Sequence, residues 1–196
     1  MLSLIRPALV SLGLFTLILG LAYPLAIVGL AQGALPFQAG GSLVRQGDHV
    51  VGSALIGQRF TTARYLHGRP SAAGTDGYDA SASSGSNLGP LNADLAKRVR
   101  DSAAALKAEA AGRTIPADAV TTSASGLDPH ISPAYAELQA ARIAAARGVD
   151  AGRVQALIRS HVEGRTLGFI GQPRVNVLLT NLALDAAFGE GQPPVR

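Results

Sequence analysis

The chain has 196 residues, of which 17 are Lys or Arg and 13 are Asp or Glu, for a formal net charge of +4. It contains no cysteine, which excludes disulfides and thiolate metal sites. The basic residues form no continuous run and only 5% of the chain is aromatic, so nucleic-acid binding by a phosphate-tracking stripe with base stacking is disfavoured.

Charge is missing from a long stretch near the N-terminus. No Asp, Glu, Lys or Arg occurs between Arg6 and Arg45, and residues 8–31 are mostly Leu, Ile, Val, Ala and Phe. A bilayer core of about 30 Å needs roughly 20 apolar residues in a helix. The sequence therefore predicts a short N-terminal tail over residues 1–7 and a membrane-spanning helix over residues 8–31. A cleaved signal peptide is the competing interpretation, but its apolar region would be only about 7 to 15 residues long.

Two details of this helix bear on its surroundings. Pro24 removes a backbone donor inside the span, which predicts a kink and suggests a neighbouring helix that compensates for it. Arg6 and the α-amino group precede the span, and the positive-inside rule keeps such a tail in the cytoplasm. The following domain is therefore expected outside, in the periplasm of a bacterial cell.

The rest of the chain is long enough for one domain of ordinary size. Residues 32–47 are rich in Gly and small residues and are predicted to be a connector, so the domain is expected over residues 48–196. Residues 48–56 indicate a strand or hairpin. Residues 68–90 predict a long loop, which is either a binding surface or a flexible Ser/Gly insertion.

Helices are expected further along. Residues 91–112 have apolar residues at helical spacing, and Gly112 is expected to cap the helix. Residues 120–122 suggest a short strand. Ser132 and Pro133 begin a second helix that stops at Gly148, and Asp150 caps a third. Residues 165–170 are expected to be extended and residues 175–188 to form a buried helix. The fold class is a helix-rich α+β domain behind one transmembrane helix.

The sequence offers no autonomous active site. It has no Gly-x-Ser-x-Gly, His-Glu-x-x-His or phosphate-loop motif, and its four histidines stand at no ligand spacing. The serine and glycine amides of residues 83–90 could form a concave nest for an anion, with Arg69 or Arg165 as countercharge. Ordinary turn chemistry is the alternative explanation.

Short motifs in a fixed order along the whole chain give a resemblance to a known family. The chain resembles the C subunit of the bacterial Kdp potassium-transporting ATPase. The motifs are Arg6-Pro7-Ala8, Tyr23-Pro24-Leu25, residues 52–58 (GSALIGQ), Gly68-Arg69-Pro70-Ser71, Gly85-Ser86-Asn87-Leu88, Gly171-Gln172-Pro173, Val175-Asn176 and residues 181–185 (NLALD). Leu66 and Thr180 depart from the pattern, where an aromatic and an apolar residue are usual.

The resemblance implies a non-catalytic accessory subunit in the bacterial inner membrane. Its implied partners are a potassium-translocating subunit, an ATP-hydrolysing subunit and a very small stabilising peptide. The family role is assembly of the complex and assistance to ATP binding, with no cofactor of its own and ATP met only through the catalytic subunit. Residues implied to contact nucleotide are Ser84, Gly85, Ser86, Asn87 and Gln139. Docking of the membrane helix is expected around Tyr23 and Pro24.

Nucleotide contact requires a cytoplasmic domain, whereas the flanking charge favours the outside. On the outer side the domain would cap the potassium entrance, where Asp76, Asp79 and Asp128 could attract cations without supplying a carbonyl-lined selectivity filter. An anchored envelope adaptor or solute-binding domain is the alternative function. A membrane-tethered hydrolase is disfavoured, because the sequence shows no nucleophile and base in a recognisable arrangement.

Overall fold

The computed structural model describes residues 2–189. The chain divides into two compact units, of which the first ends at Ser53 and the second begins at Ala54.

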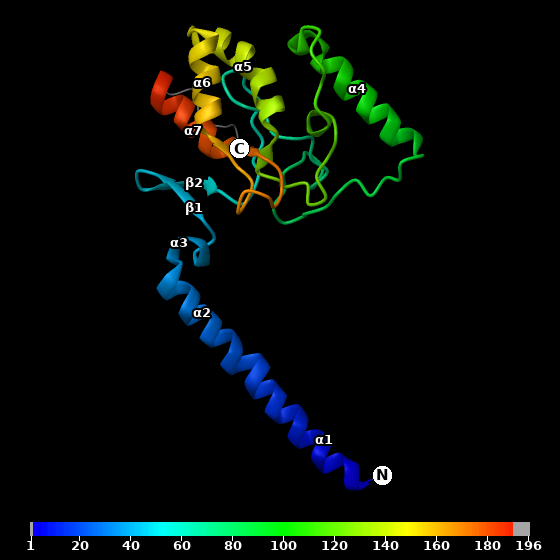
Figure 1. Cartoon of the computed structure of the whole chain (residues 1–196). Coiled ribbons are helices and arrows are strands. Elements are labelled where there is room, and N and C mark those ends of the chain that lie inside the picture. The colour runs from blue at the N-terminus through cyan, green and yellow to red at the C-terminus, as the bar shows by residue number, and fades with distance from the viewer. Residues whose placement is uncertain (1, 190–196) are drawn as a thin grey trace. The chain divides into compact units, whose positions relative to one another are not determined.

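A long helix makes up most of the first unit. It runs as one continuous ribbon through α1 (Leu2–Phe15), the π-helix η1 (Thr16–Ala22) and α2 (Tyr23–Ala34) (Figure 1). The stretch from Ser3 to Ala34 is long and apolar enough to cross a membrane, and none of its most apolar window is buried. The predicted span over residues 8–31 lies inside this helix, and a membrane-crossing helix provides the physical reason for so many exposed apolar side chains.

Hydrogen bonding within this helix changes just before Pro24. The backbone N–H of Tyr23 donates to the carbonyl of Ile18, five residues earlier. Because proline has no N–H and its ring would press on the carbonyl of Gly20, a regular α-helix would be strained at this point. The wider π turn accommodates the proline, so the irregularity expected at Pro24 extends upstream over residues 16–22.

The segment after the helix is more ordered than its composition predicts. Residues 32–47, expected to be a connector without structure, contain the end of α2, the one-turn helix α3 (Pro36–Ala39) and the strand β1 (Leu43–Gln46). β1 pairs antiparallel with β2 (His49–Ser53) around a two-residue turn in which Gly47 has a φ of 59°. Of the glycines that suggest a connector, Gly47 is thus a turn residue of a hairpin, whereas Gly33 lies in α2 and Gly40 follows α3.

The second unit is a helix-rich α+β domain, as predicted. Its sheet has three short antiparallel strands in the order β3 (His130–Ile131), β5 (Arg174–Asn176), β4 (Val162–Glu163). Its helices are α4 (Ala93–Ala110), α5 (Pro133–Arg147), α6 (Ala151–Ser160) and α7 (Val177–Phe188), with one 3-10 turn, η2 (Ala117–Ala119). Leu66, Ile143, Ile158, Val175 and Leu184 are fully buried, so the core lies among α5, α6, α7 and the central strand.

The predicted caps of α5 and α6 are confirmed, whereas α4 ends with a left-handed C-cap at Ala111, one residue before the predicted Gly112. The hydroxyl of Ser132 accepts from the N–H of Tyr135, and the carboxylate of Asp150 accepts from the N–H of Arg153. Gly148 ends α5 in the left-handed conformation, with a φ of 66°. These caps satisfy N–H and C=O groups that a helix cannot pair internally, which fixes the ends of α5 and the start of α6.

Three local predictions are wrong in detail. Residues 120–122 are not a strand, because the carbonyls of Thr121 and Thr122 accept hydrogen bonds from Arg69 instead of from a neighbouring strand. Residues 165–170 form a tight turn with an isolated bridge between Thr166 and Ile170. The last helix begins only at Val177, since the preceding three residues form the central strand β5.

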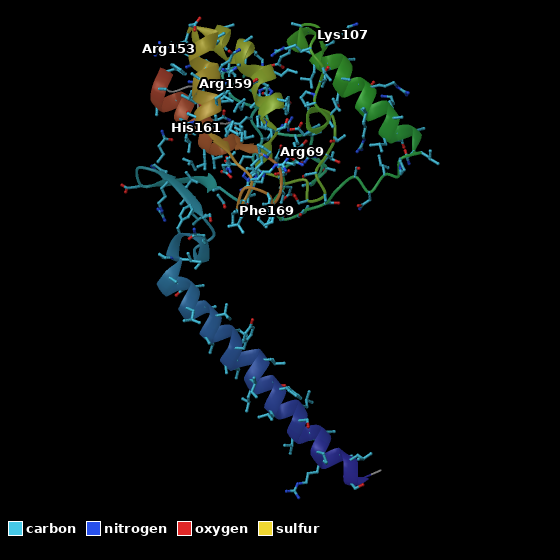
Figure 2. The ribbon with its side chains drawn as sticks, in the orientation of Figure 1. Arg69, Lys107, Arg153, Arg159, His161 and Phe169 are labelled. Carbon is cyan, nitrogen blue, oxygen red and sulfur yellow. The ribbon has the colours of Figure 1, made fainter. Side chains whose placement is uncertain are left out.

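The predicted long loop is present. No helix or strand occurs between Ala54 and Asn92. The exposed basic residues Lys107 and Arg153 lie at one end of the second unit, and Phe169 lies at the other (Figure 2). The loop is ordered by side chains from the helices and from residues 117–132, which brings its motifs into one polar network.

Candidate functional site

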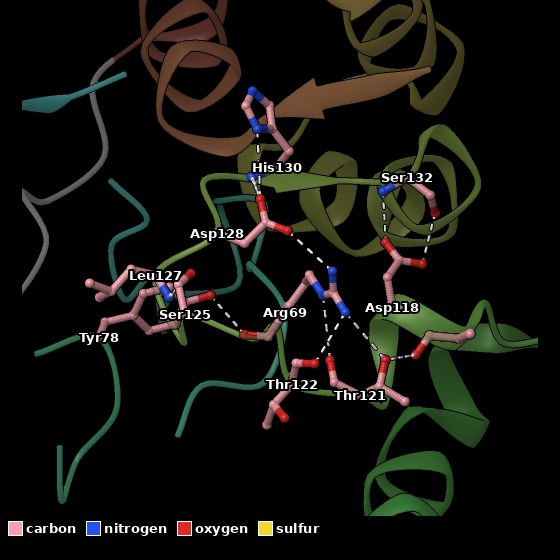
Figure 3. Close-up of polar contacts among 11 residues, drawn as sticks. Arg69, Tyr78, Asp118, Thr121, Thr122, Ser125, Leu127, Asp128, His130 and Ser132 are labelled. Carbon is pink, nitrogen blue, oxygen red and sulfur yellow. Dashed lines mark hydrogen bonds and ion pairs between the residues drawn. The ribbon is translucent and has the colours of Figure 1, made fainter. Parts of the chain in front are cut away.

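Arg69 is the centre of the polar network. Its guanidinium forms an ion pair with Asp128 at 3.1 Å and also donates to the carbonyl of Thr122 and to the hydroxyl and carbonyl of Thr121 (Figure 3). Both charged side chains are mostly shielded from solvent. Arg69 therefore joins the long loop to residues 121–128, and its donors are used within the domain.

Asp128 receives hydrogen bonds from two sides. Its second oxygen accepts from the backbone N–H of His130 at 3.0 Å and lies 3.6 Å from the ring Nδ1 of the same residue. Burial by itself would raise the pKa of Asp128, but the hydrogen bonds from His130 and the ion pair with Arg69 outweigh it and lower the pKa below its ordinary value. Asp128 is therefore charged at neutral pH and already paired.

Ser71 and Tyr78 close the first turn of the loop. The hydroxyl of Ser71 donates to the carbonyl of Gly126 at 2.6 Å and accepts from the N–H of Tyr78 at 2.8 Å. The hydroxyl of Tyr78 donates to the carbonyl of Arg69, and burial raises its pKa to about 12. Gly126 has a φ of 68°, and a Cβ there would stand 2.6 Å from the carbonyl oxygen of Ser84. Only glycine allows the two segments to lie this close.

The predicted nucleotide segment, residues 84–87, packs against residues 124–126. The N–H of Ser84 donates to the carbonyl of Ser125, and a Cβ at Gly85 would lie 2.8 Å from the carbonyl oxygen of Ala124. Ser86 lines a cavity of about 320 Å³, together with Leu95 and Arg98 of α4 and residues of the loop. Asn87 is exposed with a φ of 52°. The Ser84 amide is therefore used within the domain, and the side of the segment at Ser86 faces open space.

Gln139, the other predicted nucleotide residue, has a fully buried side chain. Its carboxamide accepts from the N–H of His67 at 2.8 Å and donates to the carbonyl of the same residue at 3.0 Å. Asn181 on α7 holds Leu66 in the same two-bond manner, at 2.7 and 3.0 Å. We call these two pairs the amide clamps. They imitate the paired bonds of a β-ladder, and the contacts found for Gln139 do not join it to residues 84–87.

Two arginines of α5 extend the clamps along residues 63–67. Arg142 donates to the carbonyls of Ala63 and Tyr65 and pairs with Glu109 at 2.8 Å. Arg147 donates to the carbonyl of Arg64 and pairs with Asp185 at 2.8 Å. Every carbonyl from residue 63 to residue 67 therefore accepts from a side chain of α5 or α7.

The residues in reach of these networks do not form a catalytic arrangement. His67 is mostly buried, which lowers its pKa, with nearby Arg142 acting in the same direction, and its Nε2 faces the carbonyl of Thr62. The hydroxyl of Ser71 donates to a carbonyl and not to a base. Within residues 2–189 no group of three or more His, Asp or Glu side chains is placed to hold a metal ion. The polar side chains of these networks form hydrogen bonds mainly with the backbone of the domain itself.

Gln139 and the loop motifs could be named from the sequence, whereas Arg142, Arg147 and Asn181, which hold residues 63–67, could not. Two of these stand on α5 beside Gln139, and the third falls in the Asn181-Leu182-Ala183-Leu184-Asp185 motif. A buried polar residue within an apolar helix is the one signal that could have marked Asn181. Tyr23 and Pro24, expected to dock the membrane helix, are exposed at the start of α2.

These features define the class of protein. A single apolar helix, long enough to cross a membrane, precedes one α+β domain whose polar side chains brace its own long loop, which describes a domain anchored by one helix. Residues 5–186 match the family of K+-transporting ATPase c chains. The chain belongs to this family, and it is accordingly a subunit of an ATPase and not an enzyme on its own.

Relatives cover essentially the whole chain. It is 66% identical over 189 residues to the potassium-transporting ATPase KdpC subunit of Caulobacter vibrioides (strain NA1000 / CB15N), covering 96% of this chain and 95% of that protein. It is 60% identical over 197 residues to the protein of the same name from Beijerinckia indica, covering all of both chains. The corresponding protein of Gemmatimonas aurantiaca is 54% identical, over 100% of this chain and 98% of that one.

Proposed function

We propose that the chain is the accessory subunit that assembles and stabilises an ATP-driven potassium-uptake complex, with its domain as a rigid brace against the partner subunits. The observation that carries this proposal is the clamped loop. Its residues 63–67 are held by Gln139, Asn181 and the two arginines of α5, and its Gly68-Arg69-Pro70-Ser71 motif is held by the bonds of Arg69 and Ser71 to residues 121–128. These polar groups therefore maintain one shape instead of performing chemistry. A rigid surface of defined shape is what an assembly subunit needs, because preorganisation lowers the cost of binding.

The proposed partners are the potassium-translocating subunit, the ATP-hydrolysing subunit and the small stabilising peptide of the same complex. The chain would reside in the bacterial inner membrane. Arg6 before the span favours a cytoplasmic tail and a periplasmic domain. In that position the domain caps the potassium entrance of the translocating subunit.

Assistance to ATP binding is the second candidate. Its support is the cavity beside Ser86, where Arg98 of α4 supplies a positive charge. Against it, the amide of Ser84 and the carboxamide of Gln139 are already bonded within the domain. Capping and assembly therefore fit the geometry better than nucleotide contact.

The side of the domain can be tested with one cysteine, because the chain has none of its own. Leu91 is 99% exposed, so Leu91→Cys provides an accessible thiol without disturbing the core. In sealed spheroplasts carrying the whole complex, a membrane-impermeant maleimide should label this thiol without permeabilisation. Labelling that appears only after permeabilisation would place the domain in the cytoplasm and overturn the capping proposal.

Docking of the membrane helix can be tested separately at Pro24. Pro24→Leu restores an uninterrupted apolar helix and should lower the yield of intact complex while membrane insertion stays normal. Pro7→Leu is the matched control, because it makes the same replacement at the other proline inside the helix, near its N-terminal end. Equal yields of complex from both variants would mean that the helix only anchors the chain and that Pro24 plays no part in docking.

A further inference from the structure

The turn at residues 166–170 carries three large apolar side chains into solvent. Leu167 is 79% exposed, Phe169 70% and Ile170 50%. Because all three belong to one closed turn of five residues, we call this segment the apolar turn. Exposed apolar groups gathered at one place mark an interaction site more often than scattered ones do.

Backbone bonds hold the apolar turn in one conformation. The N–H of Thr166 donates to the carbonyl of Ile170 at 3.0 Å, and the N–H of Ile170 donates back at 2.9 Å. Leu167 and Gly168 both have positive φ values, of 55° and 83°. Next to the turn, Arg165 donates to Gln172 at 3.1 Å. The three side chains are therefore presented by a closed turn, and little conformational entropy remains to be lost on binding.

The apolar turn lies near the point where the anchoring segment enters the domain. Asn176, at the end of β5, donates to the carbonyl of Ala54 at 2.8 Å. Ile170 precedes Asn176 by six residues, a path of at most about 20 Å. The two residues after Ala54 are Leu55 and Ile56, which are also exposed and apolar. Lys107 and Arg153 lie at the end of the second unit opposite to Phe169 (Figure 2).

The anchoring segment itself is short. The apolar helix ends at Ala34, and Leu43 of β1 pairs with Ser53 of β2. Because the hairpin returns to its starting point, it adds almost no length between the helix and Ala54. The remaining nine residues from Ala34 to Leu43 reach at most about 30 Å, and α3 shortens that path. The tether thus keeps the apolar turn within reach of the bilayer surface.

We propose that the apolar turn inserts Leu167, Phe169 and Ile170 into the headgroup boundary of the bilayer that anchors the chain. A stable protein interface needs about 800 Å² per partner, roughly 20 to 30 residues on each side, which one turn cannot supply. Shallow insertion needs only a few apolar side chains when a tether already supplies a high local concentration. The insertion gives the domain a second membrane contact and restricts its rotation about the tether.

The experiment uses the full chain in nanodiscs, alone and within its complex. Single-cysteine variants L167C and F169C carry an environment-sensitive fluorophore, and L91C is the control on an exposed site elsewhere in the same unit. Lipids with spin labels near the headgroup and an aqueous iodide quencher report on the surroundings of each fluorophore. The expected result is a blue shift and quenching by the shallow spin-labelled lipid at positions 167 and 169, with iodide quenching at position 91.

Two results would overturn the proposal. Iodide quenching at all three positions, with no effect of spin-labelled lipid, would mean that the turn stays in water. If positions 167 and 169 were protected from both quenchers, and only when the chain is in its complex, the turn would contact a partner subunit instead of lipid. Either result leaves the proposed accessory function standing, because a lipid contact is compatible with a domain on either side of the membrane.

Discussion

Replacing Gln139 with alanine provides the sharpest test of the clamped loop. The substitution removes both bonds to the His67 backbone and leaves its N–H and C=O without partners. A buried backbone group left unpaired costs about 1–3 kcal/mol, and because His67 is mostly but not fully buried the lower part of that range applies to each group. The expected loss is about 2–4 kcal/mol of unfolding free energy, which lowers the melting temperature by on the order of 10 °C.

The measurement is thermal unfolding of the full chain in detergent, followed by near-ultraviolet circular dichroism of its tyrosines. Gln172→Ala is the matched control, because Gln172 is exposed and contacts only Arg165, so its loss should stay within about 0.5 kcal/mol. If Gln139→Ala melts with the control while the complex loses nucleotide affinity, the clamp is not structural and the residue serves nucleotide binding instead.

Three further predictions concern the same domain. Gly126→Ala should lower the unfolding free energy by several kcal/mol, because the added Cβ would meet backbone atoms. The control Gly112→Ala, at a φ of 84° with open space around it, should lower it by only about 1–2 kcal/mol. Similar melting temperatures for the two variants would contradict the close approach at Gly126. Thr180→Val should raise the unfolding free energy by about 1 kcal/mol, because the buried hydroxyl of Thr180 has no hydrogen-bond partner, and a lower melting temperature would refute this. Asp128 has a pKa below its ordinary value of 3.8, so its contribution to stability is complete above pH 3.8 and is lost as the pH falls through the lowered value. Denaturant titrations between pH 6 and pH 2 should therefore show a shallower acid loss for Asp128→Asn than for the unaltered chain.

Elements that depend on neighbouring residues could be predicted from the sequence. Ser132 and Pro133 mark the start of α5 because a cap acts over three residues, and Gly148 marks its end because a left-handed residue is needed there. The membrane helix follows from composition alone. In each case the decisive interactions lie within a few residues of the pattern that predicts them.

Elements that depend on distant partners could not be predicted from the sequence. β5 is short and takes its hydrogen bonds from β3 and β4, two strands that the sequence does not single out. Thr121 and Thr122 have good strand propensity, yet Arg69, more than fifty residues earlier, takes their carbonyls. Tertiary contacts override local preference at such positions.

The candidate site could be predicted only in part, for the same reason. The composition of residues 83–90 correctly indicated a loop dense in turn chemistry. It could not indicate that the amide of Ser84 is bonded to Ser125, or that the side chain of Gln139 is buried against His67. A glutamine on a helix has the same sequence pattern whether it faces a ligand or a neighbouring loop.

The amide clamps also order the folding of the chain in time. The backbone of Leu66 bonds to Asn181, 115 residues later, and the backbone of His67 bonds to Gln139, 72 residues later. Contacts of such high sequence separation form late, because the loop they close must first lose its entropy. During synthesis the apolar helix is complete long before α7 exists, so the chain is anchored in the membrane while most of its domain is unfolded. The clamp on Leu66 therefore cannot form before α7, the last helix, has been synthesised.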